Sequence, residues 1–393
     1  MRGSFLVSMA LVVIPMASAI VTRSQGMSST PDRTGPQTTP YGRAAVEAGG
    51  LIYVSGVTGP VEGVRPAGDV GTQTKQALAR LGTALATMGA SLDTVVSMNV
   101  VLKRAEDLDA MNAAYREVFA VDPPVRTTIA GEVPDFAAIE ISAVAVKVGA
   151  TREVLLPKGW MKSPRPHSYA IRTDDLVFFS GLVSRRPSDD KVMSGTPAQQ
   201  TKTILDNARD LLDAADLTFD DVVAARVFVT DDSYFEPMNG VYRTFFPANP
   251  PARATVVSEL MGESNVEISL IASTKGKQIL GASLSPSLPV SAAVRAGARV
   301  FLSGVLGDTD ANEFDAVSQA RESFAKVTHT LTSNGLSLVD VVDSTLYIRG
   351  LEDTRPILAV YRELFPSPPA TTLIGTRLVP RAALVEVLLT AYK

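Results

Sequence analysis

The stretch from Val95 to Val146 reads VVSMNVVLKRAEDLDAMNAAYREVFAVDPPVRTTIAGEVPDFAAIEISAVAV, and it decides the fold because the chain repeats its plan three times. It runs from an apolar strand through a short helix with a Tyr-Arg pair and a Pro-Pro corner to a strand that carries Glu140. The second copy is displaced from the first by 127 positions (253 − 126), and the third from the second by 119 (386 − 267). Such fixed offsets indicate an internal repeat, which sets the whole fold. The marker residues are Val95, Tyr115, Arg126 and Glu140 in copy 1, Val222, Tyr242, Arg253 and Glu267 in copy 2, and Val341, Tyr361 and Glu386 in copy 3.

Composition excludes several classes of function. The 393 residues carry a formal net charge of −4 without a basic block, which argues against a nucleic-acid surface. The chain has no cysteine, so disulfides, thiolate nucleophiles and cysteine-ligated metals are excluded. Two histidines are too few for a common zinc site, and we expect neither a metal nor a cofactor.

The amino terminus has the features of an export signal. Arg2 precedes an apolar run from Phe5 to Ile14, and Ala17-Ser18-Ala19 supplies small residues for a signal peptidase. We interpret residues 1–19 as a cleaved signal and 20–39, rich in Ser, Thr, Pro and Gly, as a flexible leader. This predicts a periplasmic or secreted protein with no membrane segment after cleavage. A retained membrane anchor is the alternative, although the apolar run is short for a membrane span.

Each copy is expected to be an α+β unit. In copy 1, residues 51–57 form an apolar run that holds Gly56, typical of a buried strand whose backbone closely approaches another group. Apolar spacing predicts a helix over 72–88 and another over 108–119, the second capped by Asp107. The chain then divides into a domain at 40–149, a linker and domain at 150–275, and a linker and domain at 276–393. We expect Trp160 to pin the first linker by packing.

The order strand, strand, helix, strand, helix, strand, strand resembles that of the Rid (YjgF) family. The shared motifs are Ser-Gly after the first apolar run, Asn-x-x-Tyr in the second helix, Pro-x-Arg at the corner and Glu in the last strand. The resemblance implies a chorismate-mutase-like α+β subunit that normally forms a homotrimer with ligand clefts between subunits. Three fused copies then predict a single-chain pseudo-trimer, a monomeric chain whose intramolecular docking persists on dilution.

The resemblance also implies a function and a set of site residues. Rid proteins hydrolyse reactive enamines and imines such as 2-aminoacrylate to 2-keto acids and ammonia without a cofactor. An arginine binds the substrate carboxylate, since guanidinium offers two parallel donors, and a glutamate lies near the attacking water. On this resemblance the expected catalytic residues are Glu140 and Glu267, and the substrate-binding residues are Tyr41, Ser55, Asn112 and Arg126 in copy 1 and His167, Ser180, Asn239 and Arg253 in copy 2.

Copy 3 departs most from the pattern. It keeps Ser303 and Glu386 but has Val290, Leu358 and Thr371 where the family has tyrosine, asparagine and arginine. We therefore expect two carboxylate-binding sites in the chain and a degenerate third. The degenerate copy and the export signal favour an alternative function, a non-catalytic small-carboxylate-binding or scaffold protein, while endoribonuclease activity is disfavoured by the acidic charge.

The same residues also have structural interpretations. Arg126 and Arg253 could form ordinary ion pairs, and strand alternation alone would place the glutamates on the outer face of each sheet. Because glutamate persists in the copy without arginine, it could serve the contact between copies. The asparagines could bond to the backbone, and His167 could be a solvated surface residue.

Overall fold

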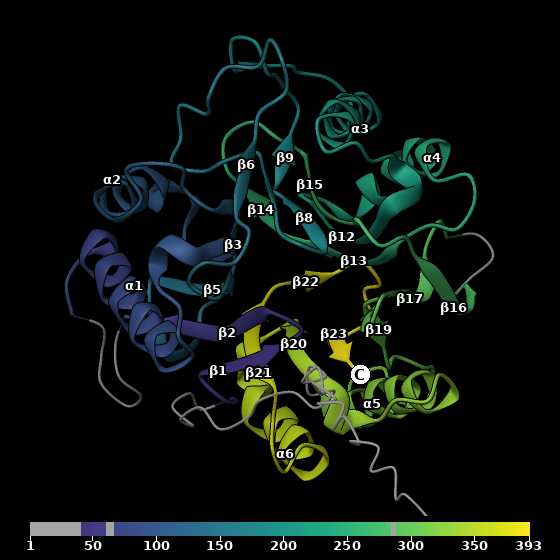
Figure 1. The fold of residues 1–393 in the computed structure, drawn as a ribbon. Helices are drawn as coiled ribbons and strands as arrows, with labels where there is room; N and C mark the ends of the chain where they lie inside the picture. Colours follow the sequence, from purple (N-terminus) through teal and green to yellow (C-terminus); the bar gives the residue numbers. More distant parts are fainter. Residues whose placement is uncertain (1–40, 60–66, 284–287) are drawn as a thin grey trace, which may run out of the picture.

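The computed structural model describes residues 41–59, 67–283 and 288–393, and it shows three similar units arranged around a common axis (Figure 1). The signal and leader expected over 1–39 lie outside the described residues. Within the described residues, no helix is long and apolar enough to cross a membrane.

Copy 1 is a five-stranded sheet with two helices. Its elements are β1 (Ala45–Ala48), β2 (Leu51–Thr58), α1 (Val70–Thr87), β3 (Val95–Leu102), α2 (Leu108–Val118), β4 (Val125–Ala130) and β5 (Ile139–Val146). The strand order is β1-β2-β5-β3-β4, and β3 and β4 run parallel because α2 crosses over between them.

Copies 2 and 3 repeat this plan with small additions. Copy 2 and its linker comprise β6 (Glu153–Leu155), β7 (Ala170–Arg172), β8 (Leu176–Phe179), β9 (Leu182–Val183), β10 (Arg185–Arg186), β11 (Lys191–Val192), α3 (Pro197–Asp213), β12 (Val222–Val229), α4 (Phe235–Phe245), β13 (Ala252–Val257), β14 (Glu259–Leu260) and β15 (Val266–Ser273). Copy 3 comprises β16 (Gln278–Ser283), β17 (Ser291–Ala296), β18 (Arg299–Leu302), β19 (Val305–Leu306), α5 (Ala316–Ser333), β20 (Val341–Ile348), α6 (Thr354–Leu364), β21 (Ala370–Gly375), β22 (Arg377–Leu378) and β23 (Val385–Tyr392).

One helix start and one helix cap differ from the sequence-based expectation. Helix α1 begins at Val70 rather than 72, because the Asp69 side chain accepts a hydrogen bond from the Thr72 amide and caps the helix there. The expectation that Asp107 caps α2 was wrong in its chemistry. Asp107 stands before the helix, but its carboxylate binds the Arg104 guanidinium at 2.8 Å.

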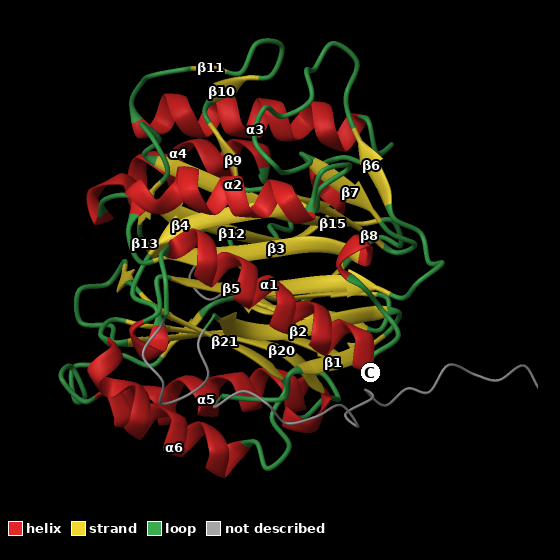
Figure 2. Cartoon of the chain, turned by 90° about the vertical axis from the view of Figure 1, so that its left-hand side faces the viewer, coloured by secondary structure: helices red, strands yellow, loops and turns green. Residues whose placement is uncertain are grey.

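Neighbouring sheets are joined at their edges. The short strand β14 of copy 2 pairs with β4 of copy 1, and β22 of copy 3 pairs with β13 of copy 2. An isolated bridge between Glu132 and Gly375 links copies 1 and 3. The three sheets therefore close into a ring whose strands lie inside and whose helices lie outside (Figures 1 and 2).

Apolar residues from all three copies fill the interior of the ring. One cluster contains equivalent aromatic residues of β2, β8 and β18, namely Tyr53, Phe178 and Phe301. Another contains Val101, Phe228 and Tyr347. Each helix pair covers the opposite face of its own sheet and forms a separate core there. The predicted fold, three tandem α+β domains packed as a single-chain pseudo-trimer, is confirmed.

Candidate functional site

Adjacent copies meet where the Pro-x-Arg corner of one touches the Ser-Gly turn of the next. We name these contacts the 1–2, 2–3 and 3–1 junctions. At the 1–2 junction the Arg126 amide donates to Ser180 Oγ at 3.1 Å, and the Gly181 amide donates to the Arg126 carbonyl at 3.1 Å. Ser180 Oγ in turn donates to the Ser168 carbonyl at 2.6 Å. The serine hydroxyl therefore holds the two copies in register.

The same bonds recur at the other junctions. The Arg253 amide donates to Ser303 Oγ at 2.8 Å, and the Thr371 amide donates to Ser55 Oγ at 2.8 Å. Thr371 pairs with Ser344 on the neighbouring strand, at the register where Arg126 pairs with Met98 and Arg253 pairs with Ala225. It therefore occupies the arginine position of copy 3.

Arg126 lies buried at the 1–2 junction without an acidic partner. Its side chain is only 5% exposed, and its guanidinium stands 5.0 Å above the Tyr115 ring. Nη1 contacts the Met111 sulfur at 3.8 Å, and Nε has no hydrogen-bond acceptor. Nearby, Asn112 Oδ1 is also buried without a hydrogen bond. Because a buried cation is costly unless paired, this arrangement calls for an anion.

Arg253 has the equivalent setting at the 2–3 junction. Its guanidinium stands 4.7 Å above the Tyr242 ring, and Nη2 donates to Asn239 Oδ1 at 2.8 Å. Nη1 remains without an acceptor. In the described residues neither this arginine nor Arg126 forms an ion pair with a carboxylate, and burial lowers the pKa of both. Asn239 therefore orients the guanidinium rather than bonding to the helix backbone.

The copy that follows each arginine supplies a buried glutamate. Glu267 of copy 2 lies beside Gly181, whose amide bonds to the Arg126 carbonyl, and Glu386 of copy 3 lies in the same way beside Gly304 at Arg253; the charge of each glutamate acts on its arginine. Burial raises the pKa of each carboxyl to about 8, although a backbone amide of the preceding copy and the arginine charge both act to lower it. Each carboxyl therefore holds a proton at neutral pH and can donate a hydrogen bond.

The Ser-Gly turn needs glycine because of this carboxyl. A Cβ on Gly181 would lie 1.7 Å from Glu267 Oε1, and one on Gly304 would lie 1.8 Å from Glu386 Oε1. Gly56 stands in the same relation to Glu140, at 1.8 Å. The close approach expected from the sequence at Gly56 is therefore an approach to the glutamate of the same copy.

The 3–1 junction has a different interior. Thr371 Oγ1 lies 2.8 Å from the Tyr361 hydroxyl, and Leu358 replaces the asparagine. Tyr41 of copy 1 packs against the apolar core of copy 3. Glu140 is buried here with its pKa raised to about 8, mainly by burial, but it faces no arginine. Among the described residues, the arginine nearest in the chain to this junction's serine, Arg43, directs its guanidinium to Ser367 Oγ, and no arginine acts on the pKa of Glu140.

His167 lies at the edge of the 1–2 junction, beneath the first linker. Its Nε2 lies 3.2 Å from Ser163 Oγ, and its Nδ1 has no hydrogen-bond partner. Burial and the charge of Arg126 lower its pKa well below the usual value. A cavity of about 50 Å³ beside it is lined by Trp160, Tyr169 and Gly181, among others. His167 is thus a neutral, partly covered side chain and not a solvated one.

The linker is fixed over this junction by a cluster of polar and aromatic contacts. Trp160 stands edge-on to Tyr169 at 5.0 Å and its Nε1 donates to Asp210, so it pins the linker by packing as expected. Arg165 and Arg185 both bind Asp190 of the turn between β10 and β11.

The structure divides the residues expected from the sequence among different junctions. Arg126 and Asn112 meet Ser180, Glu267 and His167 at the 1–2 junction, whereas Tyr41, Ser55 and Glu140 of the same copy lie at the 3–1 junction. Arg253 and Asn239 meet Ser303 and Glu386. Sequence reasoning left Glu386 out because its own copy lacks arginine. The retained Ser303 and Glu386 in that copy were the signal that it serves a neighbour.

Three α+β units closed into a ring, with each corner strand against the Ser-Gly turn of the next, define a Rid-type fold. The chain belongs to the endoribonuclease L-PSP family, which matches residues 33–147, 161–274 and 281–393. Reactive Intermediate Deaminase A, chloroplastic, of Arabidopsis thaliana is 33% identical over 140 residues, which are 35% of this chain and 73% of that protein. The human 2-iminobutanoate/2-iminopropanoate deaminase is 34% identical over 108 residues, 27% of this chain and 79% of that protein. The resemblance to Rid proteins is confirmed.

A solved structure shares the fold over most of the chain. The crystal structure of a chorismatase superposes with a TM-score of 0.53 and 15% identity, and the match covers 76% of this chain and 93% of the other. At this identity the likeness concerns the fold alone.

Proposed function

We propose that the chain hydrolyses small carboxylate-bearing imines and enamines to 2-keto acids and ammonia at the 1–2 and 2–3 junctions. The observation that carries the proposal is a buried guanidinium that forms no ion pair and shares its junction with a buried carboxyl of the next copy. This arrangement occurs at both junctions. The names of the Arabidopsis and human relatives support deamination of this substrate class.

The residues suggest how the reaction proceeds. The guanidinium binds the substrate carboxylate and fixes the imine carbon opposite the glutamate. The protonated carboxyl of Glu267 or Glu386 donates its proton to the imine nitrogen as a water oxygen adds to the carbon. The carboxylate then takes a proton from the added water, which leaves a carbinolamine and restores the carboxyl. The carboxyl next protonates the amine nitrogen, the carbon–nitrogen bond breaks to release ammonia, and the carbinolamine hydroxyl returns its proton to the carboxylate as it becomes the keto oxygen. One water is consumed, and the carboxyl regains its starting state.

The two junctions differ in the residue at the family's tyrosine position. His167 stands there in copy 2, whereas copy 3 has the buried Val290. We therefore propose that the 2–3 junction prefers a more apolar substrate side chain than the 1–2 junction. Export of the chain is part of the proposal, supported by the charged, apolar and small-residue segments of its first 19 residues.

The test is release of 2-keto acid from freshly generated 2-aminoacrylate by the purified chain. Arg126→Ala and Arg253→Ala should each remove one active junction, and the double variant should lower turnover at least about tenfold, since 1.4 kcal/mol of lost binding corresponds to that factor. Carboxylate binding without turnover in the parent chain would instead identify a binding protein. Three equivalent binding sites by calorimetry would contradict the arginine assignment.

A second comparison tests whether each arginine acts with the glutamate of the next copy or with the glutamate of its own copy. Glu386→Gln should silence the 2–3 junction, because Glu386 faces Arg253. Glu140→Gln is the matched variant at the junction without arginine, and it should leave turnover unchanged. If Glu140→Gln lowers turnover and Glu386→Gln does not, the pairing across copies is wrong.

A further inference from the structure

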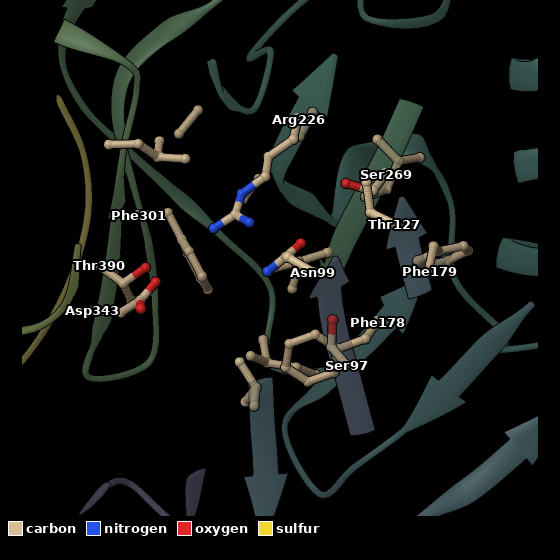
Figure 3. Close-up of a pocket in the computed structure, with 18 of the residues that line it drawn as sticks. Ser97, Asn99, Thr127, Phe178, Phe179, Arg226, Ser269, Phe301, Asp343 and Thr390 are labelled. Atoms are coloured by element: carbon tan, nitrogen blue, oxygen red, sulfur yellow. The ribbon is translucent and has the colours of Figure 1, made fainter. Parts of the chain in front are cut away.

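Another arginine without an ion pair among the described residues, the half-buried Arg226, lies in the interior of the ring, away from the junction arginines. A cavity of about 80 Å³ opens there between the three sheets and is lined by residues of all three copies (Figure 3). The guanidinium of Arg226, on β12, points into this space between Asn99 and Phe301. The rings of Phe178 and Phe301 contribute to its apolar walls.

Arg226 occupies one of three equivalent positions. Asn99 on β3 and Thr345 on β20 are offset from it by the repeat distances of 127 (226 − 99) and 119 (345 − 226). The strand registers agree, since the three residues pair with Thr127, Ala254 and Thr372 of the corner strands. A symmetric homotrimer would place three identical side chains here, and three arginines would repel one another. The fused chain places one guanidinium beside one amide and one hydroxyl.

The guanidinium has little to satisfy it within the protein. In the described part of the chain its side chain forms one hydrogen bond, a long one from Nη2 to Thr345 Oγ1 at 3.4 Å, and no ion pair. Asp343 lines the same cavity from the same strand as Thr345, two residues earlier, yet does not reach Arg226 as an ion pair. A cation in a small cavity with apolar walls is unfavourable without a counter-charge.

We propose that this cavity binds one small monovalent anion, of the size of formate or a halide, on the guanidinium of Arg226. The Asn99 amide lines the same cavity and can donate a further hydrogen bond, while the Thr345 hydroxyl accepts from the guanidinium. The cavity volume suits such an ion and not a ligand with a long side chain. Asp343 opposes the anion when it is ionised, and burial raises the pKa of this carboxyl to about 6.

The first test is thermal unfolding of the full chain in increasing sodium formate. A ligand that binds only the folded state raises Tm with the logarithm of its concentration. Arg226→Met keeps the apolar stem of the side chain and should abolish this rise. Measured in the same formate series, this variant also shows how much of the Tm change is a general effect of salt. The Arg126→Ala/Arg253→Ala double variant should keep it, because its changes lie at the junctions. Loss of the rise in the double variant with persistence in Arg226→Met would overturn the proposal.

A second pair of measurements does not depend on the folding of Arg226→Met. Asp343→Asn removes the opposing charge, so the rise in Tm should begin at a lower formate concentration than in the parent chain. An unchanged or higher onset would contradict the site. Crystals soaked in bromide should show an anomalous peak within hydrogen-bonding distance of the Arg226 guanidinium, and an empty cavity at saturating bromide would reject it.

Discussion

The three buried glutamates make stability depend on pH in a direction that can be measured. Glu140 is the clearest case, because no arginine faces it and burial is the main cause that raises its pKa to about 8 from the usual 4.5. A carboxyl with a raised folded-state pKa stabilises the fold fully below the unfolded pKa. That contribution is lost as the pH rises from about 4.5 through about 8.

The size of the loss follows from the two pKa values. One pKa unit corresponds to about 1.4 kcal/mol, so the difference between about 8 and 4.5 amounts to at most about 5 kcal/mol of folding free energy for Glu140 above pH 8. Glu140→Gln keeps the shape of the side chain without its ionisation. The variant should therefore match the parent near pH 4.5 and exceed its stability increasingly up to pH 8, by about 1.4 kcal/mol for each pH unit at most.

Denaturant unfolding of both chains between pH 4.5 and 9 measures this difference. Glu117→Gln is a suitable control, because the Glu117 side chain is 61% exposed on the surface and its removal should change stability by less than about 0.5 kcal/mol. A parent-minus-variant difference for Glu140→Gln that stays constant across the pH range would refute the reasoning.

Three further outcomes are expected. Gly181→Ala should displace the Glu267 carboxyl and destabilise the fold by about 1–3 kcal/mol. Gly240→Ala on α4, where a Cβ meets nothing within 4 Å, should be neutral or stabilising. Equal effects of the two substitutions in denaturant unfolding would contradict the close packing at Gly181. Arg299→Met removes buried hydrogen bonds to the Tyr53 hydroxyl and the Ala48 carbonyl, which join copies 3 and 1. The free energy of unfolding should fall by about 2–4 kcal/mol and Tm should fall with it. An unchanged Tm would count against that contact. Amino-terminal sequencing of exported protein should begin at Ile20, and intact Met1 would reject cleavage.

The fold could be predicted from the sequence because the motifs that indicate it depend on the backbone within a few residues of them. The Ser-Gly turn, the Pro-Pro corner and the helix stripes each report on the backbone near them, and their repeated offsets showed that three units exist. Helix caps depend on side-chain contacts that the sequence does not specify, since Asp69 and Asp107 are both suitable caps and only the Asp69 carboxylate bonds to its helix.

The site needed contacts between copies, which a repeat cannot specify. Within one copy, Arg126 and Glu140 look like a functional pair, but they lie at different junctions. Which neighbour receives which residue depends on the direction in which the ring closes. The interior position of Arg226 could have been identified from the offsets alone, because one basic residue is aligned with an asparagine and a threonine in strands that are mostly apolar.

The edge pairing of the sheets has a consequence for how the protein is made. Strand β4 emerges from the ribosome early, but its partner β14 follows only after most of copy 2 has been synthesised. The ring closes last, when Gly375 reaches Glu132 and the Thr371 amide reaches Ser55. Until then, open strand edges remain available for pairing with other chains. A nascent chain that stalls before copy 3 would therefore be a natural client for chaperones that shield such edges.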